Sequence, residues 1–190
     1  MAARLADSIR QESLTPSLIA SLRRGEAAAG ALLNDVYRQA MLRYCWGYLG
    51  TLDDAEDAVQ EIFCKVLQGK SVPDNFRAWL YKVARNHCLD LIKMRGRRRD
   101  NRRLPTKTQP DGGLTGDLSR LVRRELHSRL GHLLDALSPD QREVLRLRYA
   151  ENLSRADIAE VLDLPESIVK SRLYEGLVKL RQHASLMADS

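Results

Sequence analysis

The sequence predicts an all-α protein made of two small helical domains joined by a flexible basic linker. Apolar residues recur three and four positions apart along most of the chain, which is the spacing of one helical face, and we find no convincing strand pattern. Residues 105–116, which are rich in Pro, Gly and Thr, follow a strongly basic run and interrupt the helical pattern. We therefore expect domains at residues 1–96 and 120–190, with the linker at residues 97–119.

Composition limits the classes of protein to consider. The chain has 190 residues, of which 44% are hydrophobic and 29% are charged, as in folded proteins. A net charge of +6 favours polyanionic partners. The absence of a long apolar run argues against membrane insertion or a secretory signal, so we expect a cytoplasmic protein. The three cysteines and four histidines have no ligand spacing, and we expect no metal or cofactor.

The first domain reads as a series of helices. An early helix is indicated by Leu33, Val36, Ala40 and Tyr44. The next helix opens at residues 51–54, and its apolar stripe comprises Val59, Ile62, Phe63, Val66 and Leu67. A loop at residues 69–75 precedes a long helix that ends near residues 95–96. Its inward residues are Phe76, Leu80, Val83, Ala84 and Leu91.

The second domain ends in a helix, a tight turn and another helix. Ser154 and Asp157 predict the start of the first helix, and a second start signal, a capping box, lies at residues 138–141. Asp163 occupies the turn position that needs a left-handed backbone, which Asp tolerates. The last helix begins near Glu166. Its inner stripe comprises Ile168, Val169, Leu173, Leu177 and Leu180.

This pattern is typical of a helix-turn-helix, whose second helix enters the major groove of DNA. A plain helical hairpin has the same spacing and remains an alternative. The polar and charged side chains on the outer side of the last helix can bind phosphates and base edges. The candidate DNA-binding residues are Ser167, Lys170, Ser171, Arg172 and Glu175.

Residues 53–61 hold five acids and no base, which is unusual in a basic chain. These acids are Asp53, Asp54, Glu56, Asp57 and Glu61. They could stabilise the positive start of a helix or bind a protein partner with a basic face. Metal-dependent catalysis is the weakest of the three interpretations, since no histidine lies nearby.

The long helix after Phe76 has a second, polar face. It comprises Trp79, Lys82, Asn86, Asp90 and Lys93, with Arg85 beside it. Such side chains can hold unpaired bases and phosphates. A core role is the better interpretation for Trp79, whereas we expect a functional role for Asn86. The following run, which includes Arg97, Arg98 and Arg99, is either an electrostatic contact or a soluble hinge.

Three motifs together resemble the extracytoplasmic-function (ECF) class of bacterial sigma factors. They are DAEDAVQEIFCKVL at residues 54–67, NFRAWLYKVARNHCLDLIKMRGRR at residues 75–98, and LSPDQREVLRLRYAENLSRADIAEVLDLPESIVKSRLYEGLVKLR at residues 137–181. The resemblance covers about residues 27–184 and implies a non-enzymatic protein that carries core RNA polymerase to promoter DNA and helps to open it. No small-molecule substrate is implied.

The resemblance also implies roles for particular residues. Core polymerase would be bound by Asp54, Asp57, Gln60 and Glu61. The minus-ten element would be bound by Asn75, Lys82, Arg85, Asn86 and Lys93. The candidate DNA-binding residues of the last helix would bind the minus-thirty-five element. Linker contacts to DNA or polymerase would come from Arg97, Arg98 and Arg99. A dedicated anti-sigma protein is a further implied partner. The rival interpretations are a stand-alone helix-turn-helix regulator and a metal-dependent nucleic-acid enzyme.

Overall fold

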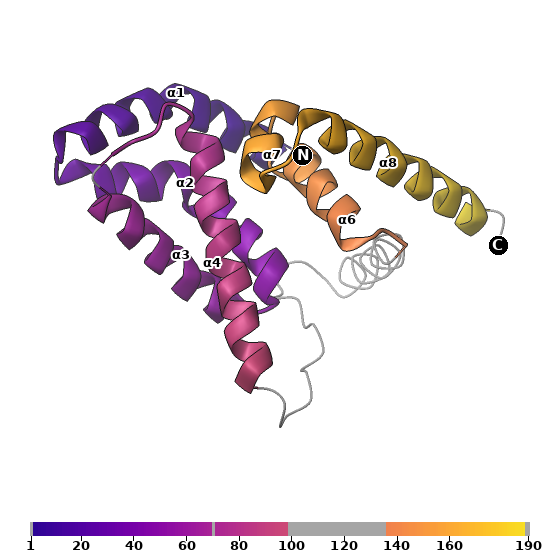
Figure 1. The fold of residues 1–190 in the computed structure, drawn as a ribbon. Coiled ribbons are helices and arrows are strands. Elements are labelled where there is room, and N and C mark those ends of the chain that lie inside the picture. Colours follow the sequence, from indigo (N-terminus) through magenta and orange to yellow (C-terminus); the bar gives the residue numbers. More distant parts are fainter. Residues whose placement is uncertain (1, 70, 99–135, 189–190) are drawn as a thin grey trace, which may run out of the picture. The chain divides into compact units, whose positions relative to one another are not determined.

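The computed structural model describes residues 2–69, 71–98 and 136–188, and the side chains within 13–69, 71–96 and 136–183. All regular structure in these ranges is helical, as predicted (Figure 1). Contacts divide the chain into two compact units, Met1–Pro110 and Asp111–Ser190. Each unit has its own core of buried apolar residues.

The described residues of the first unit form four helices. They are α1 (Ala2–Arg24), α2 (Ala28–Leu49), α3 (Leu52–Gln68) and α4 (Phe76–Arg98). Helix α2 contacts all three others, so it lies at the centre of the unit. Its predicted inward residues Leu33, Val36, Ala40 and Tyr44 are all buried.

Helix α3 begins and packs largely as predicted. The Thr51 hydroxyl accepts a hydrogen bond from the backbone N–H of Asp54, 3.3 Å away, and caps the helix. Val59, Ile62 and Val66 are buried against the core. Leu67 is exposed, so its place in the predicted stripe was wrong. It lies in the last turn of the helix and keeps 44% of its area exposed.

Aromatic side chains join α2 to the start of α4. Tyr44 meets Tyr81 edge to face at 5.1 Å, and Tyr37 meets Phe76 in the same way at 5.8 Å. Such contacts add about 0.5–1.5 kcal/mol each to the burial of the rings. Phe76, Leu80 and Ala84 are buried as predicted, whereas Leu91 lies further along α4 and is only half-buried.

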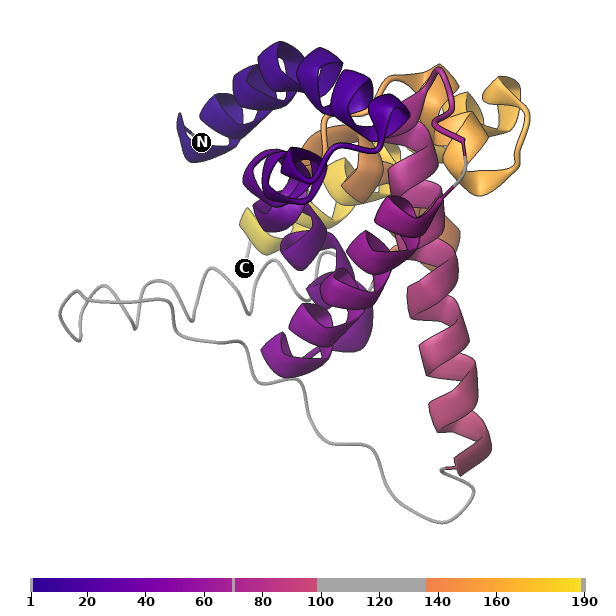
Figure 2. The same cartoon turned by 90° about the vertical axis from the view of Figure 1, so that its left-hand side faces the viewer.

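Helix α1 was not predicted. It carries Pro16 in its interior, which disfavours a helix in a sequence-based reading. Tertiary contacts stabilise its C-terminal half: Leu18 and Ser21 are buried, and the Thr15 and Tyr37 hydroxyls lie 2.9 Å apart. Figures 1 and 2 show α1 lying across α2.

The second unit contains α6 (Pro139–Leu145), the π-helical turn η1 (Arg146–Ala150), α7 (Arg155–Leu162) and α8 (Glu166–Ala188). Ser138 and Gln141 form the predicted capping box at the start of α6. The π-helical turn was not predicted. It continues α6, and its Arg148 guanidinium donates to the Leu153 carbonyl at 2.8 Å, which fixes the turn into α7.

Candidate functional site

The α7–turn–α8 segment has the geometry of a helix-turn-helix. Ser154 and Asp157 exchange hydrogen bonds of 3.0 and 3.1 Å in the capping box that starts α7. Asp163 ends α7 with φ 53° and ψ 47°, the left-handed conformation that the sequence predicted. Pro165 then leads directly into α8, so the turn is short and its geometry is fixed at both ends.

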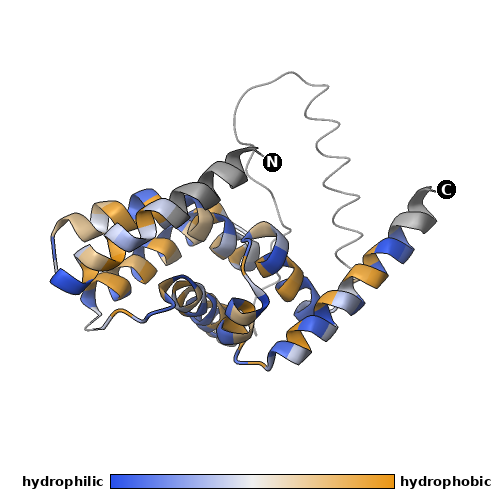
Figure 3. Cartoon of the chain, turned by 90° about the horizontal axis from the view of Figure 1, so that it is seen from above, coloured by the Kyte–Doolittle hydropathy of each residue, from blue (hydrophilic) through white to orange (hydrophobic). Residues whose placement is uncertain are grey.

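Helix α8 packs on one side and presents polar residues on the other. Val169 and Leu173 are buried as predicted. Ile168 is exposed, contrary to the expected inner stripe, because it lies one position before the buried face. The alternation of apolar and hydrophilic residues along α8 is visible in Figure 3.

The outward side of α8 forms a continuous surface. Its members recur at positions i, i+3, i+4 and i+7, and we name it the α8 outer face: Ser167, Lys170, Ser171 and Tyr174. Three of the predicted DNA-binding residues thus share one exposed surface. Tyr174 joins them with 70% of its area exposed, and sequence reasoning did not select it as a site residue.

The other two predicted residues of α8 are bound to α6. Arg172 forms an ion pair of 2.6 Å with Asp140, and its side chain is only 28% exposed. Glu175 accepts hydrogen bonds from Ser171 and from the Gln141 amide, at 2.8 and 3.1 Å. These hydrogen bonds lower the pKa of Glu175 below its usual value. Both side chains therefore contribute to the α6–α8 junction.

The same junction requires Gly176. A Cβ atom at this position would lie 2.8 Å from Leu145 Cδ1 and 3.5 Å from Gln141 Cβ. The absence of a side chain thus allows α6 and α8 to approach closely. Sequence reasoning missed this contact because its partner lies about thirty positions earlier in the chain.

In the first unit, most of the acidic cluster is exposed on α3. Asp57, Gln60 and Glu61 are exposed. Asp54 is different, since both of its carboxylate oxygens are bound by the Arg95 guanidinium of α4. The hydroxyl of Thr51 also donates to Asp54 Oδ2, at 2.6 Å. The four predicted polymerase-binding residues thus fall into an exposed group of three and one that is paired within the unit.

A buried histidine lies beneath one of the exposed acids. His87 is 8% exposed, and the Lys65 ammonium lies 3.0 Å from its Nδ1 atom. Its Nε2 atom lies 3.5 Å from Glu61 Oε2. Burial, assisted by the Lys65 charge, lowers the pKa of His87 below its usual value. Because a lysine ammonium can only donate, Nδ1 of His87 is the acceptor in this contact.

The polar face of α4 is partly exposed. Asn86 and Lys93 are exposed, with Lys93 4.0 Å from Asp90, while Lys82 and Arg85 are half-buried. Trp79 is half-buried beside Phe76, at a centroid distance of 5.8 Å, which fits the predicted packing role.

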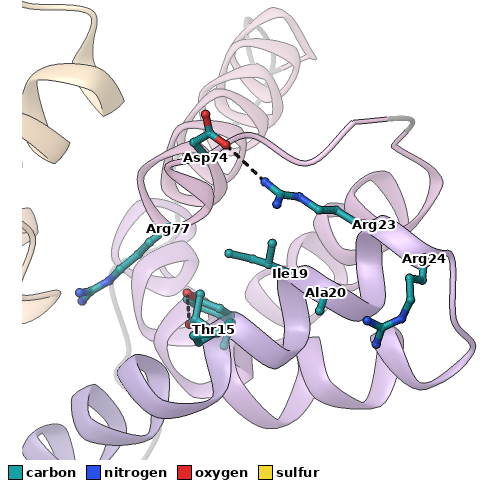
Figure 4. A pocket seen from close by; sticks show the side chains of 9 residues that line it. Thr15, Ile19, Ala20, Arg23, Arg24, Asp74 and Arg77 are labelled. Atoms are coloured by element: carbon teal, nitrogen blue, oxygen red, sulfur yellow. Dashed lines mark hydrogen bonds and ion pairs between the residues drawn. The ribbon is translucent and has the colours of Figure 1, made fainter.

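The loop before α4 is held at its C-terminal end. Asn75 Oδ1 accepts from the backbone N–H of Ala78 at 3.3 Å and so caps the helix. Asp74 forms an ion pair of 3.3 Å with Arg23 of α1. This pair borders an open hollow of about 750 Å³ between α1, Tyr37 and Arg77 (Figure 4). The unpredicted helix α1 therefore helps to position this loop.

The predicted linker residues lie largely outside the described part of the chain. Arg97 and Arg98 belong to α4, but their side chains are not described, and Arg99 lies outside the described residues, as does the rest of the linker to residue 119. Within the described residues, no group of His, Cys, Asp or Glu side chains could hold a metal ion. None of the described helices is long and apolar enough to cross a membrane.

These features define a class of protein: a helical DNA-binding protein with a helix-turn-helix and a second helical module. Comparisons with known proteins agree. The Sigma-70 region 2 family matches residues 33–98, and the Sigma-70, region 4 family matches residues 127–180. The chain is 32% identical over 165 residues to the ECF RNA polymerase sigma factor SigL of Mycobacterium tuberculosis, covering 82% of this chain and 89% of SigL.

Two further similarities span nearly the whole chain. SigW of Bacillus subtilis, also an ECF RNA polymerase sigma factor, is 27% identical over 184 residues, covering 90% of this chain and 97% of SigW. The solved structure of CnrH in complex with the cytosolic domain of CnrY is similar at a TM-score of 0.64 and 26% identity, covering 91% of this chain and 97% of CnrH.

The chain therefore belongs to the ECF family of RNA polymerase sigma factors. It directs promoter-specific transcription initiation by RNA polymerase and is not itself an enzyme.

Proposed function

We propose that three surfaces divide the work of this sigma factor. Asp57, Gln60 and Glu61 on α3 bind core polymerase. The polar face of α4 with its preceding loop holds the opened minus-ten element, and α8 reads the minus-thirty-five element. The modules that carry them are residues 1–96 and 120–190, and the basic linker of residues 97–119 contacts DNA or polymerase through Arg97, Arg98 and Arg99.

The observation that carries this proposal is that the first unit has two surfaces of different charge, one acidic on α3 and one basic on α4. Exposed Asp57, Gln60 and Glu61 on α3 suit a basic protein surface. Lys82, Arg85 and Lys93 on α4 suit phosphates, and exposed Asn86 suits a base edge. A stand-alone helix-turn-helix regulator needs neither surface, and this separates the two candidate functions.

On α8, the outer face supplies the residues that contact the minus-thirty-five element. Ser167, Lys170 and Ser171 are exposed and suit base edges and phosphates. The Ser171 hydroxyl also donates a hydrogen bond to Glu175, so it would exchange this partner for DNA. Arg172 and Glu175 contribute from the edge of this surface, where Asp140 and Gln141 hold them. Their proposed part is to fix the orientation of α8 in the groove.

The chain also has a proposed inhibitor. CnrH, a protein of the same size and fold, was solved with the cytosolic domain of CnrY bound. We propose that this chain likewise binds a partner protein, a dedicated anti-sigma protein that holds it inactive in the cytoplasm, where the polymerase acts. The rival of a metal-dependent nuclease gains no support from the described residues, which contain no metal-ligand cluster.

The experiment replaces Asn86 with Ala in the full chain assembled with core polymerase. Extruding a base costs a few kcal/mol, and a side chain that holds the extruded base offsets part of that cost. We expect Asn86→Ala to reduce open complexes about tenfold, a loss of about 1.4 kcal/mol, with little change in closed complexes.

Asn34→Ala is the matched control, because Asn34 is also an exposed helical amide but lies on α2. It should leave both kinds of complex unchanged. Equal losses of closed and open complexes with Asn86→Ala, or no loss of either, would contradict the proposed role.

A further inference from the structure

The ion pair between Asp54 and Arg95 joins two surfaces that the proposed function assigns to different partners. Asp54 lies in the first turn of α3, beside the polymerase-binding acids, and Arg95 lies near the C-terminal end of α4, whose polar face holds DNA. Forty-one positions separate the two residues in sequence. The contact therefore fixes one end of α4 against one end of α3.

The pair is well formed and partly shielded from water. Arg95 Nη1 donates to Asp54 Oδ2 at 2.7 Å, and Nη2 donates to Oδ1, so the guanidinium binds both oxygens. The side chains are 28% and 37% exposed for Asp54 and Arg95. Bidentate pairs of this kind restrict orientation more than single ion pairs do. The hydrogen bonds to Asp54 also raise the pKa of Arg95.

Little else holds the end of α4. Tyr81, Ala84 and Cys88 are buried, but no side chain described after Cys88 in this helix is fully buried. Figures 1 and 2 show this end extending past the neighbouring helices. Gly96 further weakens helix formation there. Arg95 lies seven positions after Cys88, on the same face, and so continues the contact of α4 with α3 beyond the core.

We propose that Asp54 is a positioning residue: it binds Arg95, holds the last turns of α4 in place, and so aims Lys93 at the opened promoter. Asp54 does not act as a polymerase contact, because a cation of the polymerase would have to displace Arg95 and Thr51 from the carboxylate. Asp57, Gln60 and Glu61 need no such displacement. The inference rests on the proposed DNA role of α4.

The test compares four variants of the full chain: Asp54→Asn, Arg95→Gln, the charge-swapped double variant Asp54→Arg with Arg95→Asp, and the control Asp53→Asn. Asp53 is an exposed acid of the same helical turn, so the control removes the same charge. Three quantities are measured: affinity for core polymerase, open complexes at a promoter recovered from a random library, and amide hydrogen exchange of residues 92–98.

We expect each single variant at Asp54 or Arg95 to lose open complexes about fivefold, while its affinity for core polymerase stays unchanged. Exchange at residues 92–98 should accelerate without a change in the core helices, which also shows that the variants fold. The charge-swapped variant should restore most of both properties, and Asp53→Asn should alter neither.

Three results would overturn the inference. A loss of core polymerase affinity in Asp54→Asn that the charge swap does not restore would make Asp54 a direct contact. Unchanged exchange at residues 92–98 would show that the pair does not hold the helix end, whether or not α4 binds DNA. Faster exchange with normal opening would instead contradict the proposed DNA role of the α4 end, and the positioning role would fall with it.

Discussion

Lys170 and Arg172 lie two positions apart on α8, yet the structure predicts different salt dependences for their loss. Lys170 is exposed on the outer face, whereas Arg172 is bound to Asp140 at 2.6 Å. A cation that neutralises a phosphate releases counterions, so each such contact adds about 0.9 to the slope of log affinity against log salt concentration. A cation already paired with a carboxylate adds little.

Lys170→Ala should therefore lower the slope by about 0.9, which corresponds to about an eightfold loss of affinity at about 0.1 M salt and about a twofold loss at about 0.4 M. Arg172→Ala should leave the slope nearly unchanged. The assay is binding of the holoenzyme to a duplex with the upstream promoter element, titrated with salt. Equal slope changes for the two variants would refute the reasoning, because Arg172 would then contact a phosphate directly.

Three further predictions concern stability. Ile158→Ala removes a fully buried side chain of α7 and should lower the free energy of unfolding of the second unit by about 2–5 kcal/mol in a urea titration, while Ile168→Ala, at an exposed position, should change it by less than about 0.5 kcal/mol. Ser138→Ala breaks the capping box of α6 and should cost about 1 kcal/mol in the same titration, an effect that Ser138→Asp should largely avoid. His87 has a lowered pKa in the folded chain, so the unfolded chain binds its proton more readily and stability falls as the pH drops below about 6.5. Thermal unfolding of the first unit should thus show a lower midpoint at pH 5.5 than at pH 7.5, and His87→Gln should reduce that difference; an unchanged difference would show that other groups cause it.

Local signals in the sequence were sufficient for most of the helices and their ends. The capping serines Ser138 and Ser154 and the left-handed Asp163 each depend on neighbours within four positions, and all three predictions are confirmed. The buried stripe of α2 is confirmed for the same reason, since one helical face is visible in the spacing of its own residues.

Features that depend on distant partners were not predicted. Helix α1 contains Pro16 and is stabilised by α2, so its own sequence gives a weak signal. The pairing of Arg172 with Asp140, and of Asp54 with Arg95, spans thirty or more positions. The residue types show that these side chains are charged, and their spacing predicted that they are exposed. Only the packing of the helices shows that they bind one another.

The roles of the individual site residues remain predictions, and they differ in how directly the structure supports them. Asp57, Gln60, Glu61, Asn86 and Lys170 are exposed and available for a partner. Asn75 and Asp54 already serve local structure, as a helix cap and an interhelical ion pair. Variants of the first group should therefore affect binding without loss of stability.

The central claim is that separate helices of this chain read the two promoter elements for one polymerase. Run-off transcription from a random promoter library, with core polymerase and the full chain, tests it most directly. The recovered promoters should share an upstream and a downstream motif, with Ser167→Ala weakening only the upstream motif and Asn86→Ala only the downstream one. Transcription no higher than with core polymerase alone, or both motifs weakened alike by either variant, would contradict the account.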